Sequence, residues 1–126
     1  MRVLLISDDD QTLRVSRALL DGLNCEVLVA RAGQRGMALI ELERPNVVVL
    51  DNYLPDMDTD DVVAWAQRYA APVILVIALG YTPLPAGSLA QVLISPVAPR
   101  QLAAALRPYA DSDIAAGIDD YLAGGA

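Results

Sequence analysis

The chain has 126 residues, of which 55% are hydrophobic, and a net charge of −7; this size fits one compact domain that can fold alone. Sixteen acidic residues against nine basic ones argue against direct binding to nucleic acid or to anionic membranes, because phosphate contacts dominate those affinities. Histidine and lysine are absent, which excludes histidine-based metal sites, histidine-activated nucleophiles and Schiff-base chemistry, so any chemistry must rely on carboxylates.

Neither membrane insertion nor secretion is indicated. No apolar run approaches the roughly 18 residues that a membrane-spanning helix needs. The short apolar run at the N-terminus is followed at once by aspartates 8–10, which is not typical of a signal peptide. We therefore expect a cytoplasmic protein, with neither membranes nor nucleic acids among its direct partners.

Short runs of branched apolar residues alternate along the chain with segments of helical periodicity. Asp10 is expected to cap the first helix, Asp60 or Asp61 the third, and the segment 111–113 the last. The expected strands are 2–7, 25–30, 46–50, 72–79 and 91–94. The expected helices are 10–23, 33–43, 60–69, 99–109 and 111–122.

This alternation predicts an α/β protein with three layers, in which helices cover both faces of a parallel five-stranded sheet. The flavodoxin-like strand order 2-1-3-4-5 fits the pattern. Two prolines and two glycines within residues 80–90 predict a shortened fourth helix, reduced to a loop or a single turn. We expect residues 1–110 to form the main domain and residues 111–126 an extra C-terminal helix or tail.

Acidic side chains follow the first and the third expected strands. Asp8 and Asp9 come after the first, and Asp51 ends the third. Because these two strands are neighbours in the order 2-1-3-4-5, the three carboxylates are expected to converge at one edge of the sheet. Their mutual repulsion calls for a cation, and Mg²⁺ prefers such oxygen ligands. A carboxylate beside such an ion can attack a phosphoryl group, which makes Asp51 the candidate nucleophile for an aspartyl phosphate.

Segments 3–10 (VLLISDDD) and 47–58 (VVVLDNYLPDMD) resemble the first strand with its acid pair, and the phosphoacceptor strand with its loop, of response-regulator receiver domains in two-component signalling. The resemblance covers roughly residues 2–109, although Thr59 stands where a glycine is usual. It implies a non-enzymatic phosphorelay domain. Its partners would be a histidine kinase or phosphotransfer protein, which phosphorylates Asp51, and a downstream effector protein or domain.

The same resemblance implies a Mg²⁺ site made by Asp8, Asp9, Asp51 and the backbone carbonyl of Tyr53.

Three positions depart from the family pattern. Ile77 stands where the family has a threonine or serine, Val92 where it has the aromatic switch residue, and Ser95 where it has a lysine. Each missing charge-assisted contact removes about 1.5 to 3 kcal/mol of preference for the active state. The chain is therefore expected to be an atypical receiver whose output depends on protein–protein interaction, and the altered segment 80–90 marks a face on which a homodimer is a further expectation.

Two alternatives remain open from the sequence. The first is a protein-interaction module that works without phosphorylation, which the departures at Ile77, Val92 and Ser95 favour. The second is a magnesium-dependent phosphatase of the haloacid-dehalogenase type, whose short D-x-D-x-T motif fits residues 8–12. The absence of lysine counts against the phosphatase, and that reading leaves Asp51 unexplained.

Overall fold

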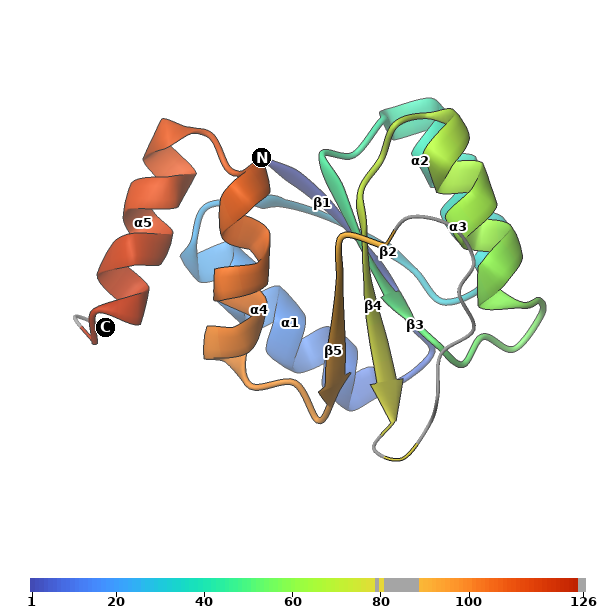
Figure 1. Ribbon diagram of the computed structural model, residues 1–126, viewed down its shortest axis with the longest axis horizontal. Helices are drawn as coiled ribbons and strands as arrows, with labels where there is room; N and C mark the ends of the chain where they lie inside the picture. The colour runs from blue at the N-terminus through green and yellow to red at the C-terminus, as the bar shows by residue number, and fades with distance from the viewer. Residues whose placement is uncertain (79, 81–88, 125–126) are drawn as a thin grey trace.

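The computed structural model describes residues 1–78, 80 and 89–124. A parallel five-stranded sheet of order β2-β1-β3-β4-β5 forms the middle layer (Figure 1). The strands are β1 Arg2–Ile6, β2 Glu26–Ala30, β3 Val47–Asp51, β4 Val73–Ala78 and β5 Gln91–Ser95. The helices are α1 Asp10–Gly22, α2 Gly33–Glu43, α3 Thr59–Arg68, α4 Pro99–Leu106 and α5 Ser112–Leu122, with the 3-10 helix η1 at Arg107–Tyr109. The predicted fold class and strand order are confirmed.

Side chains of each central strand alternate between two buried clusters, because successive residues of a strand point to opposite faces of the sheet. In β3, Val47 and Val49 join the cluster beneath α1, α4 and α5, whereas Val48 and Leu50 join the cluster beneath α2 and α3. Both faces of the sheet are therefore covered by helices. This double burial explains why β3 is an unbroken apolar run.

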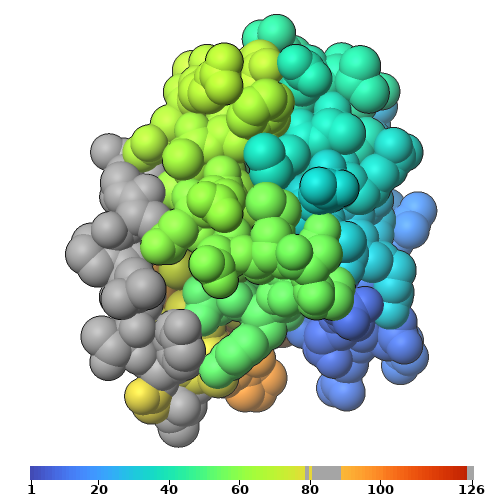
Figure 2. All heavy atoms as spheres, turned by 90° about the vertical axis from the view of Figure 1, so that its right-hand side faces the viewer, coloured from blue at the N-terminus to red at the C-terminus, as the bar shows by residue number. Residues whose placement is uncertain are grey.

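Helices α2 and α3 lie side by side on one face, as Figure 2 shows. The indole Nε1 of Trp65 in α3 donates a hydrogen bond to the backbone carbonyl of Met37 in α2, at 2.9 Å. The Tyr69 hydroxyl donates to Glu41 at 2.8 Å. These two contacts tie the pair of helices together across their outer surface.

The C-terminal segment packs as a helix. Asp111 caps α5, since its Oδ1 accepts a hydrogen bond from the backbone amide of Ile114 at 2.9 Å, as predicted for the segment 111–113. Ile118 is fully buried and Ile114 nearly so, and both belong to the cluster shared with α1 and α4. The division of the chain at residue 110 stays a prediction.

The shortened helix predicted within residues 80–90 lies largely outside the described residues, because positions 81–88 are not among them. In the part of the chain that is described, no helix is both long and apolar enough to cross a membrane.

Candidate functional site

The carboxyl ends of β1, β3 and β4 meet at one edge of the sheet. Ile6 is in register with Leu50, and Asp51 with Val76. Ser7, the residue that follows β1, is therefore brought beside Asp51, and its hydroxyl donates a hydrogen bond to Asp51 Oδ2 at 3.0 Å. The backbone amide of Tyr53 donates to Asp51 Oδ1 at 3.3 Å. The half-buried Asp51 carboxylate is thus oriented by one hydrogen bond to each oxygen.

Ser7 is the buried link between the two acidic segments. Only 3% of its surface is exposed, and its Oγ accepts a hydrogen bond from the backbone amide of Asp9 at 3.1 Å while donating to Asp51. A cavity of about 10 Å³, the size of a single water molecule, lies beside these groups and is lined by Ser7, Thr12, Ser16 and Asp51 among others. The hydroxyl of Ser7 therefore fixes the distance between the first acidic loop and Asp51.

Asp9, not Asp10, caps α1, so the cap predicted from the sequence is wrong by one residue. Asp9 Oδ2 accepts hydrogen bonds from the hydroxyl of Thr12 at 2.5 Å and from its backbone amide at 2.9 Å. These two bonds hold the pKa of Asp9 below its usual value. Asp10 begins the helix instead, and its carboxylate faces outward.

The caps predicted for α3 are also wrong. Asp58 occupies the N-cap position of that helix without a side-chain capping bond, whereas Asp60 and Asp61 lie within the first turn. Negative charge in a first turn still interacts favourably with the helix dipole.

Arg31, which follows β2, pairs with Asp8 and Asp10, two of the three consecutive aspartates after β1. Its guanidinium lies 2.7 Å from Asp10 Oδ1 and 3.8 Å from Asp8 Oδ1. Asp10 raises the pKa of Arg31 through a hydrogen bond and through its charge. Such exposed pairs contribute only about 0–1 kcal/mol to stability. Their effect on the site is electrostatic, because they place a fixed positive charge beside Asp8.

Each of the three carboxylates expected to converge has its own partner. Asp9 is bound to Thr12, Asp8 faces Arg31, and Asp51 is bound to Ser7. Among residues 1–78, 80 and 89–124, no group of three or more aspartate, glutamate, histidine or cysteine side chains is placed to hold a metal ion. The oxygen chemistry of these residues suits Mg²⁺, but their arrangement does not form its ligand set.

The three positions that depart from the receiver pattern lie on β4 and β5. Ile77 is 6% exposed and packs in the cluster beneath α2 and α3. Val92 is 39% exposed, and Ser95 is half-buried at the end of β5, in register with Ala78. Ile77 is therefore a core residue as well as a position without a hydrogen-bond donor.

Asp56 connects the loop that follows β3 to the N-terminus of α2 through hydrogen bonds. Its two carboxylate oxygens accept hydrogen bonds from the backbone amides of Gly33, at 2.7 Å, and Gln34, at 3.0 Å. The amides of Gln34 and Gly33 hold the pKa of Asp56 below its usual value. Helix α2 is thus capped by a residue more than twenty positions later, whose distance along the sequence hides it from any local capping rule.

Acid is expected to weaken the fold through such carboxylates. Asp9, Asp56 and Asp119 all have lowered pKa values, the last because Arg107 donates two hydrogen bonds to it. Their stabilising contribution is complete above the unfolded-state pKa of about 3.9 and is lost as the pH falls through the lower folded-state values. Urea denaturation from pH 7 to pH 3 should therefore show a falling midpoint. Asp56→Asn should have a lower urea midpoint at pH 7 than the wild type, and its midpoint should fall less between pH 7 and pH 3. A midpoint that depends on pH as in the wild type would contradict this role of Asp56.

Sequence reasoning missed Ser7, Thr12 and Arg31 as members of this edge. The signal for Ser7 was its place between the apolar run of β1 and the acidic triplet, where a buried hydroxyl needs a polar partner. Arg31 carried a similar signal, since it directly follows β2 just as Asp51 ends β3.

Comparison with known proteins identifies the family. Residues 3–84 match the family described as "Response regulator receiver domain". Proteins described as "Probable transcriptional regulator ycf27" are 29% identical over 112 residues in Cyanophora paradoxa and 32% identical over 111 residues in Galdieria sulphuraria. These alignments cover 84% and 82% of this chain and 46% and 43% of those proteins, so the chain spans about half the length of the curated relatives it matches.

Solved structures share the fold. A CheY-like response regulator receiver domain from Methanospirillum hungatei JF-1 is 26% identical, with a TM-score of 0.76 over 94% of this chain and 97% of that one. The chemotaxis response regulator CheY4 of Vibrio cholerae has a TM-score of 0.75 at 20% identity and covers 86% of this chain and 98% of its own. The family match over residues 3–84, together with this shared architecture, shows that the chain belongs to the response regulator receiver domains.

Proposed function

We propose that Asp51 accepts a phosphoryl group from a histidine kinase or phosphotransfer protein, and that the chain passes on the signal by binding an effector protein or domain. The observation that carries the proposal is the orientation of the Asp51 carboxylate at the carboxyl end of the central strand, with hydrogen bonds from Ser7 and from the amide of Tyr53. Membership of the receiver family supplies the signalling context.

The transfer needs only one reactive oxygen from this chain. An Asp51 oxygen forms a bond to phosphorus while the phosphorus–nitrogen bond to the histidine of the donor breaks, and the imidazole leaves. The chain's own part is to hold the carboxylate in place, which the Ser7 hydroxyl does from a buried position. Receiver domains typically bind Mg²⁺ at this site, and Asp8, Asp9, Asp51 and the Tyr53 carbonyl are the ligands proposed for it in this chain.

Asp51 phosphorylation can be tested by intact mass. Incubation with acetyl phosphate in a buffer that contains Mg²⁺ should add one phosphoryl group to the wild-type chain, because the Asp51 oxygen displaces acetate. Asp51→Asn should show no gain. Asp58→Asn, an aspartate of the same loop whose side chain makes no capping bond, should gain the group as the wild type does. No gain in the wild type would contradict Asp51 as a phosphoacceptor.

The response to phosphorylation is proposed to be weak. Ile77 offers no hydrogen-bond donor and Ser95 no positive charge, so neither provides the charge-assisted contacts that would favour a second conformation once Asp51 is phosphorylated. These departures favour the alternative of an interaction module that works without phosphate, which gains support if the mass experiment shows no transfer.

Enzymatic alternatives have little support. Receiver domains are typically non-enzymatic signalling modules, and the D-x-D-x-T motif at residues 8–12 lies inside the segment that matches the receiver family. In this motif Asp8 faces Arg31, while the Thr12 hydroxyl is bound to Asp9.

A further inference from the structure

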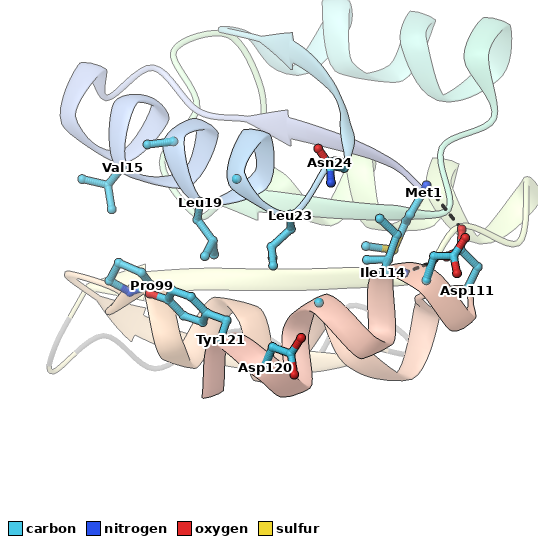
Figure 3. A pocket seen from close by; sticks show the side chains of 14 residues that line it. Met1, Val15, Leu19, Leu23, Asn24, Pro99, Asp111, Ile114, Asp120 and Tyr121 are labelled. Carbon is cyan, nitrogen blue, oxygen red and sulfur yellow. Dashed lines mark hydrogen bonds and ion pairs between the residues drawn. The ribbon is translucent and has the colours of Figure 1, made fainter. Parts of the chain in front are cut away.

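A groove runs between α1 and the extra helix α5, on the opposite side of the sheet from α2 and α3 (Figure 3). It has a volume of about 1070 Å³. We call it the α1–α5 groove; its walls include Val15, Leu19, Leu23, Ile114, Gly117 and Tyr121. Val15, Pro99 and Tyr121 lie at one end, and Met1 and Asp111 at the other.

The spacing of the wall residues is helical on both sides. Val15 and Leu19 on α1 and Leu23 at its C-cap follow one another at intervals of four residues, and Ile114, Gly117 and Tyr121 on α5 at intervals of three and four. Residues with this spacing occupy one face of a helix. Each wall is therefore about two turns long, or roughly 11 Å, and a third helix can lay an apolar face of similar length between them.

Two glycines line the groove, and contacts within the chain do not require either of them. A Cβ built on Gly22 meets no atom within 4 Å, and one built on Gly117 meets only Leu23 Cδ2, at an ordinary 3.9 Å. Neither glycine has the positive φ that would exclude other residues. Glycine is less favourable than alanine inside a helix, so Gly117 lowers the stability of α5 without serving the packing of this chain. The missing side chains of Gly22 and Gly117 leave space in which another molecule could approach the two helices closely.

Apart from the terminal amino group of Met1, the charge at the groove is negative. The charged side chains that line it are Asp111, Asp113 and Asp120. Asp111 lies 3.7 Å from the terminal amino group, whereas Asp113 and Asp120 are exposed and have no ion-pair partner among the described residues. A basic partner complements this rim. A second copy that presented the same surface would place aspartates against aspartates, which is unfavourable in a chain of net charge −7.

We propose that the α1–α5 groove docks an amphipathic helix of a partner protein, whose apolar face packs between α1 and α5 and whose lysine or arginine side chains pair with Asp113 and Asp120. The apolar walls, the unfilled space at Gly22 and Gly117, and the acidic rim all fit this one occupant. The site is separate from Asp51, which is not among its lining residues.

The probe is a capped 14-residue helical peptide of leucine, alanine and lysine in amphipathic order, labelled for fluorescence anisotropy. Its counterpart carries glutamate in place of each lysine. The lysine peptide should bind at least tenfold more tightly than the glutamate peptide. Gly117→Leu fills the groove and should weaken binding of the lysine peptide at least tenfold. Circular dichroism should show that this variant is folded, because the added Cβ meets no close contact.

Charge variants separate docking from general attraction to an acidic protein. The double variant D113N/D120N should weaken binding several-fold and reduce its salt dependence. The matched variant D60N/D61N, which removes two aspartates from the first turn of α3 on the other face, should leave binding unchanged. Equal loss in both double variants would overturn the proposal, as would unchanged binding in Gly117→Leu.

Sedimentation velocity without peptide tests whether a second copy of this chain occupies the groove. The wild-type chain should sediment as a monomer over a hundredfold range of concentration. A dimer that Gly117→Leu abolishes would overturn the proposal, because the groove would then hold a second copy of this chain.

Discussion

Replacing Ile118 by alanine is expected to lower the free energy of unfolding by about 2–5 kcal/mol. Ile118 is fully buried and packs in the cluster that α5 shares with α1, α4 and the sheet. The substitution removes three buried carbons and leaves a cavity that the surrounding side chains fill only in part. Urea denaturation followed by circular dichroism measures the loss. A loss of this size would make α5 part of the cooperative fold.

The matched control is Leu42→Ala on α2. Leu42 also loses three carbons, but 71% of its surface is exposed, so the expected change is within about 0.5 kcal/mol. If Ile118→Ala were no more costly than Leu42→Ala, α5 would be a loosely attached tail. The α1–α5 groove would then have one unstable wall.

The sequence predicted correctly the elements whose local pattern of apolar residues reflects their burial in the fold. The run from Val47 to Leu50 predicted a strand covered on both faces, and the alternation of its side chains between two clusters accounts for that run. Asp51 was predicted at the end of this strand and lies there. The flavodoxin-like strand order, which fits the alternation of strands and helices, is the one that the sheet has.

Contacts between distant segments were beyond reach of the sequence. Arg31 lies more than twenty residues after Asp8 and Asp10, and Asp56 a similar distance after Gly33. Each pair meets only because the parallel register brings the ends of β1, β2 and β3 to one edge. The strand order placed Asp8 and Asp9 near Asp51, but it could not show that Asp9 is engaged with Thr12 and Asp8 with Arg31.

The carboxylates at the carboxyl ends of β1 and β3 are therefore of two kinds. Asp51 is half-buried and held by the buried Ser7, whereas Asp8, Asp9 and Asp10 are exposed and bound to Thr12 or Arg31. The orientation of the Asp51 carboxylate depends on the position of the buried strand β1, because Ser7, which follows β1, donates a hydrogen bond to it. Any change that displaces the end of β1 is expected to disturb Asp51 through Ser7.

Gly36 of α2 lies against Ile6 at the end of β1, and Gly36→Ala is expected to lower the free energy of unfolding by about 1–2 kcal/mol. A Cβ at Gly36 would lie 2.4 Å from Cδ1 of Ile6, the last residue of β1, which is fully buried. Overpacking of this kind costs about 1–3 kcal/mol, and the better helix propensity of alanine offsets at most about 1 kcal/mol. Gly22→Ala at the last residue of α1 is the control; its Cβ meets no atom within 4 Å, so it should not lower the stability of the fold.

A double-mutant cycle with Ile6→Val tests the contact itself. Valine lacks Cδ1, the Ile6 atom closest to a Cβ at Gly36, and keeps the two Cγ atoms at 3.0 and 3.3 Å, so the double variant should lose less stability than the sum of the two single losses, by at least about 0.5 kcal/mol. Strict additivity would contradict a steric origin. Since Ser7 directly follows Ile6, Gly36→Ala should also slow phosphorylation of Asp51 by acetyl phosphate, and Ile6→Val should restore part of the rate. The absence of a side chain in α2 would then set the position of the hydroxyl that orients Asp51.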